Sequence, residues 1–269
     1  MNFKIEFASL SDTGKLRKTN EDSALVDETL ELAIVADGMG GHSSGEVASS
    51  TAIKVTRDKY DSMRRTNMKP SPFNEKFLLE TNRLGFAVQL ANSVIYEAGN
   101  STPDNKGMGT TLTAALLNGN RLCIAHIGDS RLYIFRSGAL KQITEDHSLV
   151  MDHVRKGLLT KEQAEKSPLQ NILTRALGSQ KNPLVDLCET ILHEGDRLLM
   201  CTDGLFKAVS EQKTAEILKG NTADRKACEL LVETANINGA PDNVTVVIGT
   251  VSKKTFKETF KDMLKKSYA

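Results

Sequence analysis

The sequence predicts an α+β fold, in which antiparallel β-sheets pack against pairs of helices. Three observations favour this fold class: short strand-like runs recur along the chain, the central runs are joined by tight turns, and the helical segments come in pairs. Tight turns join antiparallel strands, because a parallel pair needs a crossover of about a dozen residues or more. The pattern therefore argues against a doubly wound parallel sheet.

The first part of the chain is predicted to hold three strands and two long helices. Strands are expected at 4–7, 23–27 and 32–36. The third run is continuously apolar and ends at Asp37-Gly38, which would expose Asp37 at a strand tip. Helices are expected at 45–61 and 73–98, the second opened by Ser71 as N-cap and Pro72 as first helical residue.

A meander of strands follows, and a predicted flap interrupts it. The strands are expected at 111–117, 122–127, 132–135 and 140–143, with turns at Asn118-Gly119 and Ser137-Gly138. The stretch from about 145 to 177 breaks the strand pattern and should contain two small helices. The second helix opens with Thr160 and Gln163 at the spacing of a capping box. We therefore predict an inserted flap here.

Residues 1–252 are predicted to form a single domain. Its last part should contain a strand at 197–202, helices at 210–219 and 222–236, and a strand at 243–251. Residues 253–269 are predicted to form an amphipathic, lysine-rich helix, whose apolar face consists of Phe256, Phe260, Met263 and Leu264. We interpret it as a helix docked on the domain, the alternative being a helix on a membrane surface.

The composition of the chain limits the classes of binding partner and the cellular compartment that we expect for it. The 35 basic and 34 acidic residues leave a net charge of +1 and no basic stripe, which argues against nucleic acid as a partner. The chain shows no signal peptide and no run of about 18 apolar residues, so we expect a cytoplasmic protein without membrane insertion. The four cysteines are widely spaced, and we interpret them as reduced core thiols. Without a heptad pattern, we expect a monomer.

Four aspartates share one local setting, an apolar run next to a turn former. They are Asp37, Asp129, Asp203 and Asp242. Each alone is compatible with an ordinary turn, but four such positions could converge. A cluster of carboxylates repels itself and stays ionised only with bound cations, and an all-oxygen site suits Mg²⁺ or Mn²⁺ rather than zinc. Two such ions can activate water for in-line attack on phosphorus, so the sequence indicates phosphoester hydrolysis.

Several short segments sharpen this prediction. They are RKTNED at 17–22, VADGMGGH at 35–42, GE at 45–46, GMGTTL at 107–112, IGDSR at 127–131, TEDHS at 144–148, LTRALG at 173–178, CTDGL at 201–205 and PDNVT at 241–245. In this order, the set resembles the metal-dependent protein phosphatases, also called the PPM or type 2C family. The resemblance implies a four-layer α-β-β-α sandwich, in which two central antiparallel sheets are flanked by helix pairs and a metal centre lies at one end.

The resemblance also implies a ligand set for two Mn²⁺ or Mg²⁺ ions. Asp37 would bridge the ions, Gly38 would bind one of them through its carbonyl, and Asp203 and Asp242 would complete the protein ligands. Asp129 resembles the acid of a third, weaker metal site that it shares with Asp203.

Further residues would support this centre. Arg17 resembles the phosphate-binding arginine, whose planar fork suits phosphoryl oxygens. Glu21 and Asp22 resemble acids that act near the metals through water. Asn243 has two interpretations, as an orienting partner of a metal ligand or as part of the turn after Asp242.

Two histidines have separate interpretations. His126 falls in a predicted strand and is expected to be structural, whereas His147 begins the flap and could approach the substrate.

The implied activity is hydrolysis of phosphoserine and phosphothreonine in proteins, by direct attack of a hydroxide that bridges the two ions. Many eukaryotic relatives carry a histidine directly after Asp-Gly, where this sequence has Met39, so it looks like a bacterial member. Such members commonly oppose Ser/Thr kinases, and the expected partners are kinase substrates and the kinase itself. Three alternatives stay open: another two-metal phosphoesterase such as a nuclease, a phosphoprotein-binding relative without turnover, and a phosphatase acting on an anti-sigma antagonist.

Overall fold

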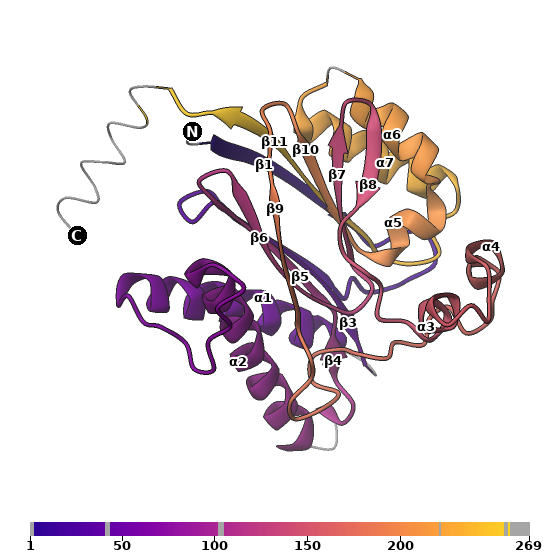
Figure 1. Ribbon diagram of the computed structural model, residues 1–269. Helices are drawn as coiled ribbons and strands as arrows, with labels where there is room; N and C mark the ends of the chain where they lie inside the picture. The colour runs from indigo at the N-terminus through magenta and orange to yellow at the C-terminus, as the bar shows by residue number, and fades with distance from the viewer. Residues whose placement is uncertain (1–2, 41–43, 102–104, 221, 256–257, 259–269) are drawn as a thin grey trace.

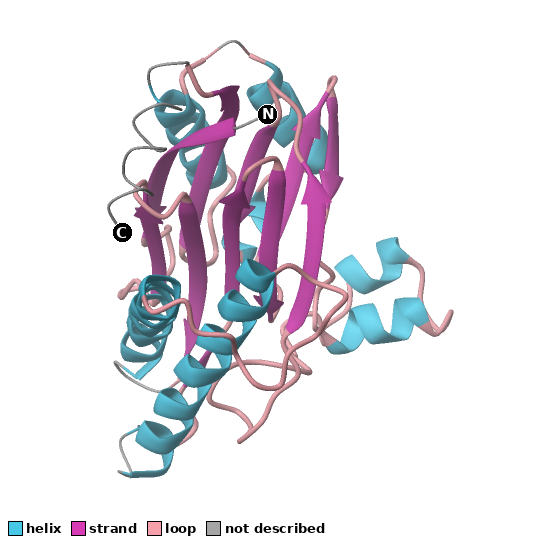
Figure 2. Cartoon of the chain, turned by 60° about the vertical axis from the view of Figure 1, so that its left-hand side comes forward, coloured by secondary structure: helices cyan, strands magenta, loops and turns pink. Residues whose placement is uncertain are grey.

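Two antiparallel β-sheets stacked face to face form the centre of the structure (Figures 1 and 2). It is a computed structural model that describes residues 3–40, 44–101, 105–220, 222–255 and 258. Helices cover the outer face of each sheet, which gives four layers. The predicted fold class is therefore confirmed.

The first sheet has the strand order β1-β11-β10-β7-β8. The strands are β1 (Phe3–Asp12), β11 (Val244–Lys253), β10 (Arg197–Cys201), β7 (Arg131–Arg136) and β8 (Ala139–Gln142). β1 and β11 pair along their whole length, from Phe3 opposite Lys253 to Asp12 opposite Val244. The loop that follows β1 consequently lies beside the loop that precedes β11.

The second sheet has the strand order β2-β3-β5-β6-β9, and β4 adds a short pairing to β3. The strands are β2 (Asp22–Asp27), β3 (Leu32–Met39), β4 (Gly109–Thr110), β5 (Leu112–Asn118), β6 (Arg121–Ile127) and β9 (Asp186–Ile191). Alternate residues of a strand point to opposite faces. Val35 therefore belongs to the core between the sheets, together with Leu198 and Val247 of the first sheet, whereas Ile34 belongs to the core under the helices.

Two long helices, α1 (Ser44–Arg65) and α2 (Leu79–Ser101), cover the second sheet. Their side chains Ala48, Ala52 and Leu84 are fully buried against it. Three helices cover the first sheet, and they are α5 (Asp203–Ala208), α6 (Glu211–Lys219) and α7 (Asp224–Ile237). The four cysteines are free thiols, and Cys123, Cys201 and Cys228 are buried as expected for core thiols, whereas Cys188 is half-buried.

The segment predicted as a flap runs between β8 and β9 and carries α3 (Leu149–Arg155) and α4 (Lys161–Glu165). Both helices stand apart from the sheets (Figures 1 and 2). The second one begins with the capping box that the sequence predicts. An antiparallel bridge between Ser148 and Leu173 joins the two ends of this segment.

Helix α2 begins later than predicted, because a distant side chain decides its start. Glu189 of β9 accepts hydrogen bonds from the Leu78 N–H at 2.6 Å and from the Thr81 hydroxyl at 2.7 Å. These bonds anchor the residue before the helix and a hydroxyl of its first turn from outside the helix. The Asn82 amide holds the preceding segment in a loop by donating to backbone carbonyls. The predicted start at residues 71–73 is therefore wrong.

The sequence pattern misses β9 and α5, and it ends β3 too early. β4 pairs with β3 at Gly38 and Met39 and so carries the strand past the Asp-Gly pair. Asp37 consequently lies within a strand and not at its tip. Charged residues such as Asp186 and Glu189 conceal β9, an edge strand that is only partly buried.

Most of the predicted C-terminal helix, at 256–257 and 259–269, lies outside the described residues. Thr255 and Glu258 exchange the reciprocal hydrogen bonds of a capping box, and Glu258 forms an ion pair with Lys4 of β1 at 2.8 Å. Within the described part of the chain, none of the helices is long and apolar enough to span a membrane.

Glu189→Ala should lower the free energy of unfolding by about 2 kcal/mol, because it leaves the Leu78 N–H and the Thr81 hydroxyl at the start of α2 without their acceptor. Urea unfolding followed by circular dichroism measures this. The control is Glu229→Ala on the exposed side of α7, which should change stability by less than about 0.5 kcal/mol. Equal losses in the two variants would contradict a special role for Glu189.

Candidate active site

A cleft of about 240 Å³ brings together most of the predicted site residues. It is lined by Arg17, Glu21, Asp37, Gly38, Met39, Gly40, Thr111, Asp129, Asn171, Leu173, Asp203, Lys207, Asp242 and Asn243. The four aspartates singled out in the sequence all belong to this lining. Asp37 lies in β3, Asp129 follows β6, Asp203 begins α5 after β10, and Asp242 precedes β11, so both sheets contribute to the cleft.

Asp37 is held in place by hydrogen bonds to its backbone. Its N–H donates to the Thr111 hydroxyl at 2.9 Å, and its carbonyl accepts from the Thr111 N–H at 2.9 Å and the Thr110 hydroxyl at 2.8 Å. The Thr111 hydroxyl also bonds to the Ser130 hydroxyl at 2.7 Å. These contacts fix the backbone and leave the carboxylate available to the cleft.

Gly38 sits where no side chain fits. A Cβ atom at this position would stand 2.1 Å from the Gly45 carbonyl oxygen and 2.6 Å from the Glu21 carbonyl oxygen. The Gly38 N–H donates to that Glu21 carbonyl at 3.1 Å. The glycine is therefore required for the close approach of β3 to the start of α1 and to the loop before β2.

Asp203 is the first residue of α5, and Lys207 follows one helical turn later. Asp203 Oδ2 forms an ion pair with the Lys207 ammonium, while Oδ1 is buried and has no hydrogen-bond partner among the described residues. The Lys207 ammonium also donates to Asn171 Oδ1 of the flap at 2.8 Å. Burial opposes the charge of Lys207, but the Asp203 carboxylate outweighs this cost and raises the pKa of the amine.

Arg17 and Asp242 meet on the open side of the cleft. The guanidinium donates to Asp242 Oδ2 at 2.8 Å, and 54% of the Arg17 side chain is exposed. Asn243 positions the loop that carries Arg17: its amide donates to the carbonyls of Thr13 and Thr19, and its Oδ1 accepts from the Glu21 N–H at 2.9 Å. Asn243 is therefore more than part of the turn after Asp242. It orients the loop of Arg17 by hydrogen bonds to the backbone of that loop.

Glu21 and Asp22 differ in their access to the cleft. Glu21 lines it, and burial together with repulsion from Asp242 raises the pKa of its carboxyl. Asp22 does not line the cleft, but it lies opposite Asp37 in the β2–β3 pairing and accepts a bond from the Thr202 hydroxyl at 2.7 Å. Thr202 therefore joins the strand before Asp203 to the strand pair that holds Asp37.

The carboxylates in the cleft and the buried Asp22 behind it disfavour one another's ionisation. Burial, followed by the charges of Asp203, Asp22 and other acids, raises the pKa of Asp37 well above its usual range. Burial and the charge of Asp203 raise the pKa of Asp129 to about 8. Burial raises the pKa of Asp22 to about 7, although the bond from Thr202 partly offsets the shift. Such mutual repulsion is relieved when cations bind.

These residues fit divalent cations chemically. In the described part of the chain, no three acidic, histidine or cysteine side chains already stand in a metal-coordinating arrangement. Arg17 and Lys207 are the cations that the structure places against Asp242 and Asp203. The donor set is nevertheless all oxygen, and the buried, unpartnered Oδ1 of Asp203 is a free acceptor. Mg²⁺ and Mn²⁺ prefer such ligands.

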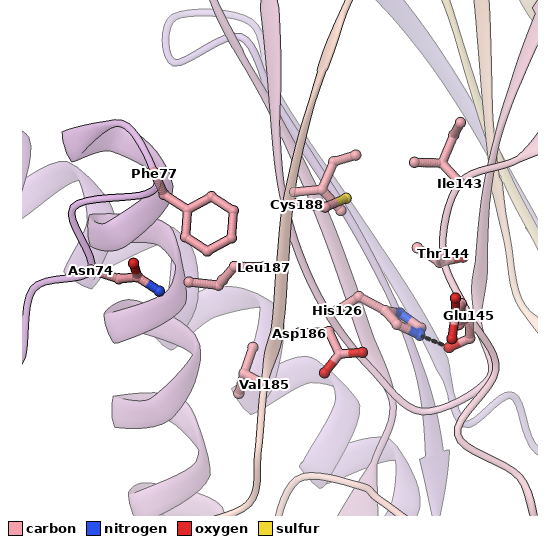
Figure 3. A pocket seen from close by; sticks show the side chains of 11 residues that line it. Asn74, Phe77, His126, Ile143, Thr144, Glu145, Val185, Asp186, Leu187 and Cys188 are labelled. Carbon is pink, nitrogen blue, oxygen red and sulfur yellow. Dashed lines mark hydrogen bonds between the residues drawn. The ribbon is translucent and has the colours of Figure 1, made fainter. Parts of the chain in front are cut away.

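A larger pocket of about 330 Å³ shares no lining residue with this cleft (Figure 3). It contains His126, whose ring bonds to the Thr113 hydroxyl at 2.8 Å and to the Glu145 carbonyl oxygen at 2.9 Å. Burial lowers the pKa of His126 to about 4, so the ring is neutral and structural, as expected. His147 is buried as well, and its Nδ1 accepts from the Gly128 N–H. The expectation that it could approach a substrate is wrong.

Among the residues that line the cleft, Lys207, Asn171 and Thr111 were given no role by sequence reasoning. The four-residue spacing of Asp203 and Lys207 is a usable signal, because it places both on one helical face. It could not be read without α5, which the pattern did not predict. Asn171 and Thr111 reach the cleft through the tertiary fold.

The sequence model of one family, protein phosphatase 2C, matches residues 17–235. The chain belongs to this family. The match takes in the loop of Arg17, the strand of Asp37 and the helix of Asp203, so the resemblance inferred from the short segments is confirmed. The structure described here is thus that of a phosphatase of the 2C type.

Individual members of the phosphatase 2C family are similar over most of the chain. The serine/threonine phosphatase stp of Listeria monocytogenes serotype 4b (strain F2365) is 38% identical over 241 residues, which are 88% of this chain and 92% of that protein. The crystal structure of the Mycobacterium tuberculosis serine/threonine phosphatase PstP/Ppp has a TM-score of 0.81 at 38% identity, covering 93% of this chain and 99% of that one. A structure of the PstP catalytic domain in complex with two manganese ions has a TM-score of 0.78 at 38% identity, covering 93% and 100%.

In excess EDTA, the free energy of unfolding should fall as the pH rises from about 4 to about 8. Folding raises the pKa values of Asp22 and Asp129, so the folded chain keeps protons that the unfolded chain releases near pH 4. Their stabilising effect is complete below the unfolded pKa and is lost as the pH passes the folded pKa. Each group should cost about 1.4 kcal/mol per pH unit within its window.

Urea unfolding at several pH values in EDTA measures this dependence. Asp22→Asn should flatten the curve below about pH 7, because the amide does not titrate. Stability that rises with pH across this window would contradict the burial and repulsion described for the cleft.

Proposed function

We propose that this phosphatase hydrolyses phosphoserine and phosphothreonine in proteins at a centre of two Mn²⁺ or Mg²⁺ ions. The observation that carries the proposal is the convergence of Asp37, Asp203 and Asp242 in one cleft, where their charges repel one another beside an exposed arginine. The names of the similar proteins support serine/threonine specificity, and the PstP complex with two manganese ions supports the metals.

The ligands in this proposal are the Asp37 carboxylate, the Gly38 carbonyl, and the carboxylates of Asp203 and Asp242. When bound, the ions would supply an activated water and neutralise charge on the phosphoryl group. The bonds from Thr110 and Thr111 keep the Asp37 backbone fixed while its carboxylate binds. Glu21 and Asp22 act behind these ligands, Asp22 through the Thr202 hydroxyl.

Arg17 binds the phosphoryl oxygens of the substrate. Its guanidinium is largely exposed at the mouth of the cleft, and Asn243 fixes the loop that carries it. A planar guanidinium can donate two parallel hydrogen bonds to phosphate. Metal binding at Asp242 would free Arg17 from its present partner.

The phosphorylated proteins are proposed to be substrates of a Ser/Thr kinase, and the kinase itself. Asn171 and Leu173 of the flap line the cleft, so the protein part of a substrate meets the flap as its phosphate enters. Residues 1–252 are proposed to act as one catalytic domain, because both sheets supply ligands. Asp129 with Asp203 forms a third, weaker cation position.

Phosphate release from a phosphothreonine peptide should require Mn²⁺ or Mg²⁺ and should stop in excess EDTA. Asp37→Ala and Asp203→Asn should each lower the rate by about 100-fold or more, because each removes a ligand that holds the activating ions. Malachite green detection measures the released phosphate. Asp58→Asn, at an exposed site on α1, is the matched control and should keep the wild-type rate.

Two results would overturn this assignment. Near-normal turnover in Asp37→Ala would remove that residue from the centre. A folded wild-type protein that releases no phosphate with either ion, from any of several phosphopeptides, would favour a phosphoprotein-binding function instead.

Arg17→Ala should lower kcat/KM for the phosphopeptide by about 10- to 100-fold, because one charged hydrogen-bonding partner of the phosphate is lost. Arg17→Lys should restore only part of it, since an ammonium lacks the planar fork. The adjacent and exposed Lys18→Ala should leave kcat/KM unchanged. If Lys18→Ala and Arg17→Ala behaved alike, general charge attraction would explain the effect instead.

A further inference from the structure

Lys207 is a basic side chain enclosed in the cleft. Only 17% of it is exposed, and its ammonium lies between Asp203 Oδ2 of the same helix and Asn171 Oδ1 of the flap. An amine enclosed in this way needs compensation for its lost hydration. Here, a carboxylate and an amide oxygen provide it.

Asp129 is a second carboxylate that acts on this ammonium. It lines the same cleft, repels Asp203 and is attracted to Lys207. The two carboxylates and the amine therefore form one charge cluster, in which the amine stands where a cation relieves the repulsion. A divalent ion at the same position would need the Asp203 oxygen that Lys207 now holds.

We propose that the Lys207 ammonium neutralises the carboxylates of Asp129 and Asp203 and occupies the position that a third divalent ion would take. The inference rests on the two-ion centre proposed above and adds a reason why the centre holds two ions and not three. Two ions bind at Asp37, Asp203 and Asp242, whereas a third binds at Asp129 only by displacing Lys207. The third position is weak because a tethered amine competes for it.

The surroundings of Lys207 favour this role over phosphate binding. Arg17 lies at the open mouth of the cleft with half of its side chain exposed, as a phosphate ligand requires. Lys207 is directed instead at a carboxylate and at the flap. Displacing it would also break its bond to Asn171, so occupation of the third position is coupled to the contact between α5 and the flap.

Manganese titration followed by electron paramagnetic resonance tests the proposal. The signal reports the concentration of free Mn²⁺, and its difference from the total gives the number of ions bound per protein. At Mn²⁺ concentrations where wild type binds two ions, Lys207→Met should bind three. The dissociation constant of the third ion should be at least about tenfold lower in Lys207→Met than in wild type. Lys207→Arg keeps the positive charge and should bind two. Lys213→Met, on the exposed side of α6, is the matched control and should also bind two.

A melting experiment gives a second readout that does not depend on catalysis. In EDTA, Lys207→Met should melt at a lower temperature than wild type, because Asp129 and Asp203 lose their shared cation. Added Mn²⁺ should raise its melting temperature more than that of wild type. The double variant Lys207→Met, Asp129→Asn should return to two bound ions.

The outcomes separate this inference from the proposed function. Two ions in wild type and two in Lys207→Met would overturn the inference and leave the two-ion centre intact. A third ion that persists in the double variant would place it away from Asp129 and overturn the inference as well. A wild type that binds no manganese would overturn both.

Discussion

Repulsion among buried carboxylates is the constraint on which the rest of this structure depends. Asp22, Asp37 and Asp129 are held partly or wholly out of water, and burial together with the charges of neighbouring acids, Asp203 among them, disfavours their ionisation. No single sheet could assemble them, because they come from strands or connections of both. The close face-to-face packing of two apolar sheets therefore holds in place a polar cluster that would otherwise separate.

Two kinds of side chain hold these carboxylates in place despite their repulsion. Threonine hydroxyls at 111 and 202 bond to the backbone of Asp37 and to the side chain of Asp22, and so fix positions without adding charge. Arg17 and Lys207 add positive charge, but one is exposed and the other enclosed. An exposed arginine can leave its carboxylate for a substrate at little cost, whereas an enclosed lysine must be displaced. The exposed ion pair of Arg17 with Asp242 is therefore easily exchanged, whereas the enclosed ion pair of Lys207 with Asp203 resists exchange.

Local patterns in the sequence were sufficient to predict the fold class, most strands and the four aspartates. They fail where a distant residue decides the outcome. The start of α2 depends on Glu189 from β9, and β3 continues through Asp37-Gly38 because β4 pairs with it. The clamp that Asn243 places on the loop of Arg17 joins residues more than two hundred positions apart, so spacing along the chain cannot reveal it. Residue roles at the cleft were inferred through resemblance to a family, since composition and periodicity alone indicate only a cluster of acids.

The flap and the cleft share a mechanical connection that follows from these contacts. Backbone and side chain of His147, at the base of the flap, both bond to Gly128, the residue before Asp129. On the other side, Asn171 of the flap accepts a bond from Lys207, the partner of Asp203. The flap is therefore connected to both acids of the proposed third cation position, to Asp129 through the two bonds to Gly128 and to Asp203 through Lys207. A displacement of the flap would therefore act on contacts that lead to both Asp129 and Asp203.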